Sequence, residues 1–200
     1  MSPAPVVRSR NARGEGQRLR GEIIDAAARL LAEQPAEGLS LRAVAREVGV
    51  SAQSLYLHFA DRHALMWAVQ EHLFAELVGA THAAAATAQG ADRLRAWCNA
   101  YCRFGLERPG HYRVLFESWV AEKVDVPLSQ LPGHPLHADL LNTLTDALPT
   151  PKRGSEDLDE LIALVWAQLH GLVSLRINKP SFPWAPMPEL VDRFLLRLLP

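Results

Sequence analysis

The sequence predicts an all-α protein, with a small N-terminal domain of three helices and a larger helical domain behind it. Apolar residues recur at the spacing of a helix face through most of the chain, which gives about nine helices. No stretch alternates apolar and polar residues as a half-buried strand does. Proline and glycine gather between the helical patterns, notably at 122–135 and 178–188, where they predict loops.

The first segment of the chain has no helical pattern. Residues 1–17 contain proline, glycine, serine and several arginines, which predicts a flexible arginine-rich arm. Such an arm could contact DNA or be an idle tail. A helix follows over about residues 18–34 and ends at Pro35. Its apolar stripe consists of Ile23, Ala26, Ala27, Leu30 and Leu31.

Two short helices joined by a tight turn are predicted at 40–48 and 51–58. Ser40 and Ser51 stand where a hydroxyl caps a helix N-terminus. Gly49 suits the left-handed conformation that ends the first helix. Helix, glycine turn and helix form the helix-turn-helix unit, whose second helix enters a DNA major groove. The inward-facing residues are Leu41, Val44, Ala45, Val48, Val50, Leu55 and Phe59.

A longer ordered set of residues surrounds this unit, over about residues 18–67. It consists of Ile23-Ile24-Asp25-Ala26-Ala27, Leu30-Leu31, Gly38, Leu41, Ala45, Gly49-Val50-Ser51, Leu55-Tyr56, His58-Phe59, Asp61-Arg62 and Leu65. This set resembles the DNA-binding domain of the TetR family of bacterial transcriptional repressors. The resemblance implies a DNA-binding domain over 18–65 and a helical ligand-binding and dimerisation domain over 66–200. It also implies a homodimer on a palindromic operator, released by a small-molecule effector.

The second short helix begins with small and polar residues, as close approach to DNA requires. Gln53 can bond an adenine edge, and Ala52 can touch a thymine methyl. By resemblance, the base-facing positions are Arg42, Ala52, Gln53 and Tyr56. The phosphate-facing positions are Ser40, Ser54, His58 and Arg62, although for His58 a core or capping role is favoured. Leu57 stands where the family often has an aromatic, and it is excluded because it cannot donate to a phosphate.

The rest of the chain predicts the helices of a second domain. A fourth helix runs from Arg62 to about residue 79, with Asp61 as its cap, and the alanine-rich stretch 79–90 either continues or breaks it. Further helices are predicted at about 91–107, from Pro109 onward, and at 136–147, 156–177 and 188–199. Trp166, His170 and Gly171 resemble the Trp-x-x-x-His-Gly motif of a TetR subgroup, and the stretch from Arg108 to Phe116 is similar to that subgroup as well.

The helix at 156–177 is apolar around more than half its circumference, so it is either core or a subunit interface. The resemblance favours a homodimer through this helix and the one at 188–199. Large aromatic residues in the same domain are candidates for an effector pocket, although each is more often core filler. They are Trp97, Tyr101, Phe104, Phe116, Trp119, Trp166 and His170.

Charge is distributed unevenly along the chain. The net charge is −1, but residues 1–65 hold nine arginines and seven acidic residues, which suits phosphate binding at one end. With two cysteines, no disulfide framework is expected, and a cytoplasmic protein fits. No signal peptide is expected, because no apolar segment follows the N-terminal arginines. No membrane span is expected, because no apolar run reaches about 18 residues.

Three rival interpretations remain. An all-helical ligand-binding module without a DNA function leaves the ordered set over residues 18–67 unexplained. Cys98 and Cys102 lie one helical turn apart and could bind a metal or sense oxidants, but two buried thiols are favoured. His111, His134 and His137 show no regular metal-ligand spacing. An enzyme is disfavoured because no Gly-x-Ser-x-Gly, phosphate-loop or His-Glu-x-x-His motif is present. No metal or other cofactor is expected.

Overall fold

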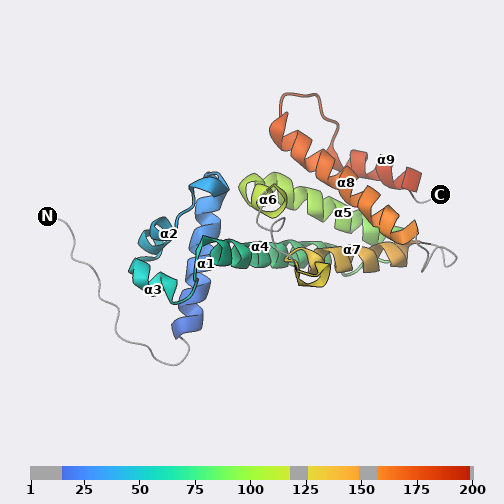
Figure 1. Ribbon diagram of the computed structural model, residues 1–200. Coiled ribbons are helices and arrows are strands. Elements are labelled where there is room, and N and C mark those ends of the chain that lie inside the picture. The colour runs from blue at the N-terminus through green and yellow to red at the C-terminus, as the bar shows by residue number, and fades with distance from the viewer. Residues whose placement is uncertain (1–14, 118–125, 149–156, 199–200) are drawn as a thin grey trace.

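The computed structural model describes residues 15–117, 126–148 and 157–198, and this part of the chain contains only helices and loops. The predicted all-α fold is confirmed (Figure 1). Its elements are α1 Glu15–Glu33, α2 Leu41–Val48, α3 Ala52–Tyr56, α4 Arg62–Ala85, α5 Gly90–Glu107, α6 Pro109–Phe116, α7 His134–Ala147, α8 Asp157–Asn178 and α9 Met187–Leu198, with 3₁₀ turns at η1 Ala36–Gly38 and η2 Leu128–Gln130.

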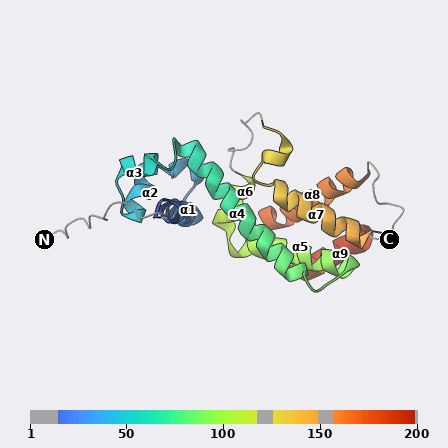
Figure 2. The same ribbon diagram turned by 90° about the horizontal axis from the view of Figure 1, so that it is seen from below.

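The first three helices form a small group at one end of the molecule, and α4 runs from this group into the larger body (Figure 2). Ile23 of α1, Val44 of α2 and Leu55 of α3 are completely buried. Leu65 and Val69 of α4 are also buried, and α4 packs on α1. Since α4 also packs extensively on α5 and α7, one helix belongs to both cores and links them.

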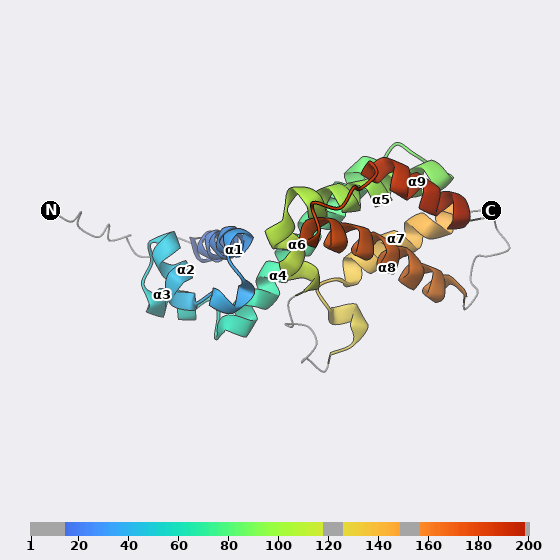
Figure 3. The ribbon, with the colours of Figure 1, turned by 90° about the horizontal axis from the view of Figure 1, so that it is seen from above.

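In the body, α5 is the central helix. It packs against α4, α6, α7, α8 and α9. The helices α8 and α9 lie on one outer side of the body (Figure 3). Val165, Leu169 and Val173 form the buried face of α8, which leaves its opposite face exposed.

Several helix ends differ from the sequence-based expectation. Helix α1 begins at Glu15, so residues 15–17 are helical, while residues 1–14 of the expected arm lie outside the described residues. Helix α4 continues to Ala85, because Thr81 and Ala85 are buried in the body and the alanines after Gly79 are compatible with a helix. Helix α3 ends at Tyr56, and α7 begins at His134 with proline in its first turn, where proline is tolerated.

Helix α8 bears on the expectation that the chain contains no membrane span. Within the described residues, its segment Leu158–Asn178 is long and apolar enough to cross a membrane by length and composition alone. Only 22% of that apolar window is buried inside the chain. The described residues therefore leave part of the apolar surface of α8 exposed.

Candidate nucleic-acid interface and effector pocket

Hydrogen bonds fix the α2–turn–α3 unit at each helix end. Ser40 Oγ accepts a hydrogen bond from the backbone N–H of Ala43 at 3.2 Å, and Ser51 Oγ accepts one from Ser54 N–H at 3.0 Å. Gly49 ends α2 with φ 76° and ψ 33°, a left-handed conformation that glycine adopts without steric cost. The caps and the turn predicted from the sequence are therefore present, and they hold α3 at a fixed angle to α2.

The outer face of α3 carries the residues predicted to read DNA. Leu55 is buried, whereas Gln53 is exposed and Tyr56 is 52% exposed. Ala52 and Ser54 are half-buried beside them, and Arg42 is exposed on α2. These side chains face solvent rather than the core, so they are free to contact a groove.

Leu57 is a surface residue that the sequence reasoning set aside. It follows α3 directly and is 82% exposed. A side chain this exposed adds nothing to the core, and the exclusion of Leu57 from the phosphate contacts stays a prediction.

His58 and Arg62 make contacts within the chain. His58 is half-buried, and its ring lies beside Gly16 in the first turn of α1. Arg62 Nε donates to the Leu39 carbonyl oxygen at 3.0 Å, and a second guanidinium nitrogen donates to the Ala36 carbonyl. Arg62 thus ties the start of α4 to the η1 turn, a structural role that the sequence did not reveal. Its phosphate role stays a prediction.

Replacing Arg62 by alanine should lower the free energy of unfolding by about 1–3 kcal/mol, because two partly buried carbonyls lose a charged donor. Urea unfolding of the variant measures this loss. Arg46→Ala is the matched control, since Arg46 is exposed on α2 and should cost little. If unfolding is unchanged while the salt dependence of DNA binding flattens, Arg62 serves phosphate alone.

The short helix α6 makes a second contact between the body and the first domain. His111 Nε2 donates to the Ala28 carbonyl of α1 at 3.0 Å. Gly110 lies so close to α1 that a Cβ there would be 2.3 Å from the Ala32 carbonyl oxygen. Gln70 of α4 donates through Nε2 to the Val114 carbonyl of α6 at 2.9 Å. Helices α1, α4 and α6 are therefore coupled directly.

Gly110→Ala should lower the free energy of unfolding by about 1–3 kcal/mol, because the backbone of α1 cannot yield to the added methyl group. Thermal unfolding measures the effect. Gly79→Ala is the control, since a Cβ at Gly79 meets nothing within 4 Å, and alanine should stabilise that exposed helical position by up to about 1 kcal/mol. Equal stability of the two variants would mean that the α1–α6 contact is loose.

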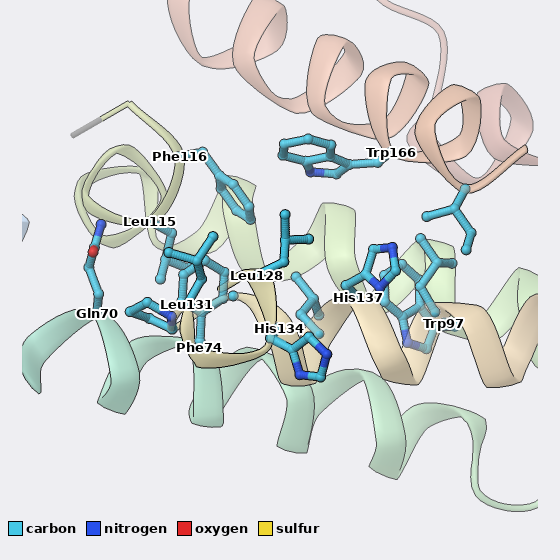
Figure 4. Close-up of a pocket in the computed structure, with 15 residues that line it drawn as sticks. Gln70, Phe74, Trp97, Leu115, Phe116, Leu128, Leu131, His134, His137 and Trp166 are labelled. Carbon is cyan, nitrogen blue, oxygen red and sulfur yellow. The ribbon is translucent and has the colours of Figure 1, made fainter. Parts of the chain in front are cut away.

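A cavity of about 360 Å³ lies in the body, between α4, α5, α6, α7 and α8. In Figure 4, Trp166 reaches toward it from α8, opposite Phe74 on α4. Among the described residues its lining carries no Asp, Glu, Lys or Arg. The lining residues are Gln70, Phe74, Trp97, Leu115, Phe116, Leu128, Leu131, Pro132, Gly133, His134, Leu136, His137, Leu140, Ile162 and Trp166.

The cavity brings together three of the seven predicted pocket residues, namely Trp97, Phe116 and Trp166. Tyr101, Phe104 and His170 do not line it, and Trp119 lies outside the described residues. The cavity wall includes η2 and the residues after it, a segment that the sequence presented only as a proline-rich loop. Its leucines, placed between prolines, were the available signal, although Leu128 itself is 68% exposed.

Comparison with known proteins decides the family. Residues 94–199 match the model of the tetracyclin repressor-like C-terminal domain, and residues 23–69 match that of bacterial regulatory proteins of the tetR family. The chain belongs to the TetR family. It is a DNA-binding, ligand-responsive transcription regulator. No curated protein matches the sequence significantly.

Solved structures share this TetR-family fold over nearly the whole chain. A protein of unknown function from Rhodococcus sp. RHA1 is 24% identical, with a TM-score of 0.73 over 98% of this chain and 97% of its own. A TetR family transcription regulator from Marinobacter aquaeolei VT8 is 20% identical, with a TM-score of 0.71 over 94% and 98%. The regulator FadR from Bacillus subtilis, in complex with stearoyl-CoA, is 14% identical, with a TM-score of 0.66 over 90% and 97%.

Two of the predicted pocket residues that do not line the cavity, Tyr101 and His170, are joined through Tyr112 in a hydrogen-bonded row. Tyr101 and Tyr112 hydroxyls lie 3.1 Å apart, and Tyr112 Oη lies 2.8 Å from His170 Nδ1. Burial lowers the pKa of His170, which Glu117 partly opposes, so the ring is neutral and Nδ1 can accept from Tyr112. In this TetR protein the histidine of the Trp-x-x-x-His-Gly motif therefore joins α8 to α6.

The two cysteines of α5 are core residues. Cys98 and Cys102 are both fully buried. Burial raises the pKa of the Cys98 thiol, with a further contribution from Cys102, and burial raises the pKa of Cys102 to about 12. Because the thiolate is the reactive and metal-binding form, neither thiol is poised for redox sensing. Within the described residues, no group of three or more His, Cys, Asp or Glu side chains could hold a metal.

Proposed function

We propose that this TetR-family regulator is a homodimeric repressor, which binds a palindromic operator and leaves it when a small molecule enters the cavity. The observation that carries the proposal is the capped α2–α3 unit with Gln53 and Tyr56 exposed on its outer face. Binding to double-stranded DNA needs no cofactor or catalytic group, so we propose no enzymatic activity. Such a regulator acts in the cytoplasm and is associated with the nucleoid when bound.

We assign two kinds of DNA contact. Arg42, Ala52, Gln53 and Tyr56 read base edges in the major groove, where a bidentate contact is worth about 1–3 kcal/mol of discrimination. Ser40, Ser54 and Arg62 fix the protein on phosphates. The capping bond uses the Ser40 oxygen as an acceptor, so its O–H remains able to donate. His58 packs against α1, so we give it a supporting role.

The proposed dimer forms through α8 and α9, since α8 presents an apolar face that the described residues leave exposed. Leu164 and Leu175 on α8 are 54% and 52% exposed, and Leu196 on α9 is 75% exposed. Gly171 lies between the two exposed leucines of α8, and a Cβ there would meet none of the described residues within 4 Å. A second copy of α8, crossing close to Gly171, accounts for the glycine and for the exposed leucines. A lipid bilayer would not explain the glycine.

The proposed signal passes through helices that both domains share. Gln70 and Phe74 line the cavity on α4, the helix whose first residue, Arg62, bonds to the first domain. Leu115 and Phe116 line it on α6, whose other end is held against α1 by Gly110. A ligand that binds more tightly to a conformation with α4 and α6 shifted than to the operator-bound conformation would weaken operator binding. The coupling free energy is typically about 1–3 kcal/mol. We therefore place the division between domains, at about residue 65, within this shared helix.

The proposal is tested by sequencing the DNA fragments that the purified full-length protein selects from its own genome. We expect strong enrichment of a few fragments that share a palindrome, confirmed by gel shift. Retention of all fragments equally, or of none, would contradict a sequence-specific repressor. Genes beside the enriched fragments should be derepressed when the protein is removed; reduced expression would indicate an activator.

A further inference from the structure

The cavity lining narrows the chemistry of the effector, an inference that rests on the proposed function of the cavity as the effector site. We infer that the effector is a small aromatic molecule carrying one phenolic or carboxyl group, which bonds to His134 and His137. We expect such a molecule to bind more tightly than a cation or a coenzyme A thioester.

The walls favour an aromatic ring. Phe74, Phe116, Trp97 and Trp166 come from four different helices and all line the cavity. The indole N–H of Trp97 donates to Asp139 Oδ2 at 2.7 Å, behind the wall. That bond uses the only donor of the Trp97 side chain, so this residue offers the cavity an apolar ring. A packed pair of aromatic rings contributes about 0.5–1.5 kcal/mol of stabilisation beyond the hydrophobic gain from its buried area.

The volume limits the size of the ligand. A cavity of about 150 Å³ lined by apolar side chains holds one benzene molecule. The cavity here, about 360 Å³, is thus suited to a molecule of about two rings. This volume lies at the lower end of the range for sites that bind drug-sized ligands.

The polar groups of the lining identify the substituent. His134 and His137 lie one turn apart on α7, and neither imidazole has a hydrogen-bond or ion-pair partner among the described residues. By contrast, His82 pairs with Asp139 and His170 bonds to Tyr112. An imidazole N–H donates to a phenolic or carboxylate oxygen. The described lining has no carboxylate, so a cation would form no ion pair with it. The described lining also has no arginine or lysine, so the phosphates of coenzyme A would form no ion pair with it.

The test uses 2-naphthoate and 2-naphthol as probes, with (2-naphthyl)trimethylammonium and palmitoyl-coenzyme A as the rival classes. Binding is followed by tryptophan fluorescence of the full-length protein without DNA, because Trp97 and Trp166 line the cavity. We expect saturable binding of 2-naphthoate and 2-naphthol, and at least about tenfold weaker binding of both rivals, a difference of about 1.4 kcal/mol.

The double variant His134→Ala/His137→Ala should bind 2-naphthoate at least about tenfold more weakly, while Asn142→Ala, an exposed position on the same helix, should bind it as the wild type does. Unchanged affinity in the double variant, tighter binding of either rival, or no binding of either aromatic probe overturns the inference. Operator binding without a probe is measured separately, so a failure of the effector class is distinguished from a failure of the repressor proposal.

Discussion

Operator affinity should fall at least about tenfold when either Gln53 or Tyr56 is replaced by alanine, because each loses a base contact worth about 1–3 kcal/mol. Both side chains are exposed on α3, and neither supports the core. The free energy of unfolding should therefore change little. Affinity for unrelated DNA should also remain, since it depends on phosphate contacts. A gel shift on the selected operator, with unrelated DNA beside it, measures both affinities.

The variants should also change which palindromes are preferred, because a lost base contact relaxes selection at that base pair. Gln89→Ala is the control, as Gln89 is an exposed residue in the body that makes no side-chain capping bond. If both variants bind the operator and unrelated DNA as the wild type does, α3 is not the reading helix. An equal loss on both DNAs would assign these residues to phosphates instead.

Gly171→Arg should convert the protein into a folded monomer that binds its operator more than about a hundredfold more weakly. A side chain at Gly171 has open space within the chain, so each subunit should keep its fold. A close crossing of two α8 helices would have no room for it. The operator affinity falls because linking two binding modules raises avidity by about 10²–10⁴-fold. Sedimentation and gel shift together measure the two effects.

Gly79→Arg is a matched control for this prediction. Gly79 is an exposed helical glycine on α4, and a Cβ there also meets nothing within 4 Å. The same substitution at that position should leave both the dimer and operator binding intact. If Gly171→Arg remains dimeric, the subunits associate through another surface, and the proposed α8 interface is wrong.

Local features were the most predictable part of this fold. The caps at Ser40 and Ser51, the left-handed Gly49 and the buried face of α2 depend on residues close in sequence, and the structure has all of them. The end of α4 was harder to place. A glycine followed by alanines permits either a break or a continuation, and the packing of Thr81 and Ala85 in the body decides for continuation.

The candidate sites depend on contacts between distant residues, which periodicity cannot supply. Helical spacing showed that Tyr101 faces inward, but not that its hydroxyl would meet Tyr112 rather than a ligand. Likewise, Arg62 was read as a phosphate contact, and its bonds to residues 36 and 39 emerged only from the fold. His134 and His137 were weighed only as metal ligands, because nothing in the sequence reveals the aromatic walls around them.

A footprint of the wild-type protein on the genomic fragment that it selects most strongly tests the central claim most directly. A dimer that reads DNA through α3 should protect two half-sites related by two-fold symmetry, with centres about 34 Å or somewhat more apart along the helix axis. A protected region without this symmetry, or protection spread along the fragment without a defined site, would contradict the account.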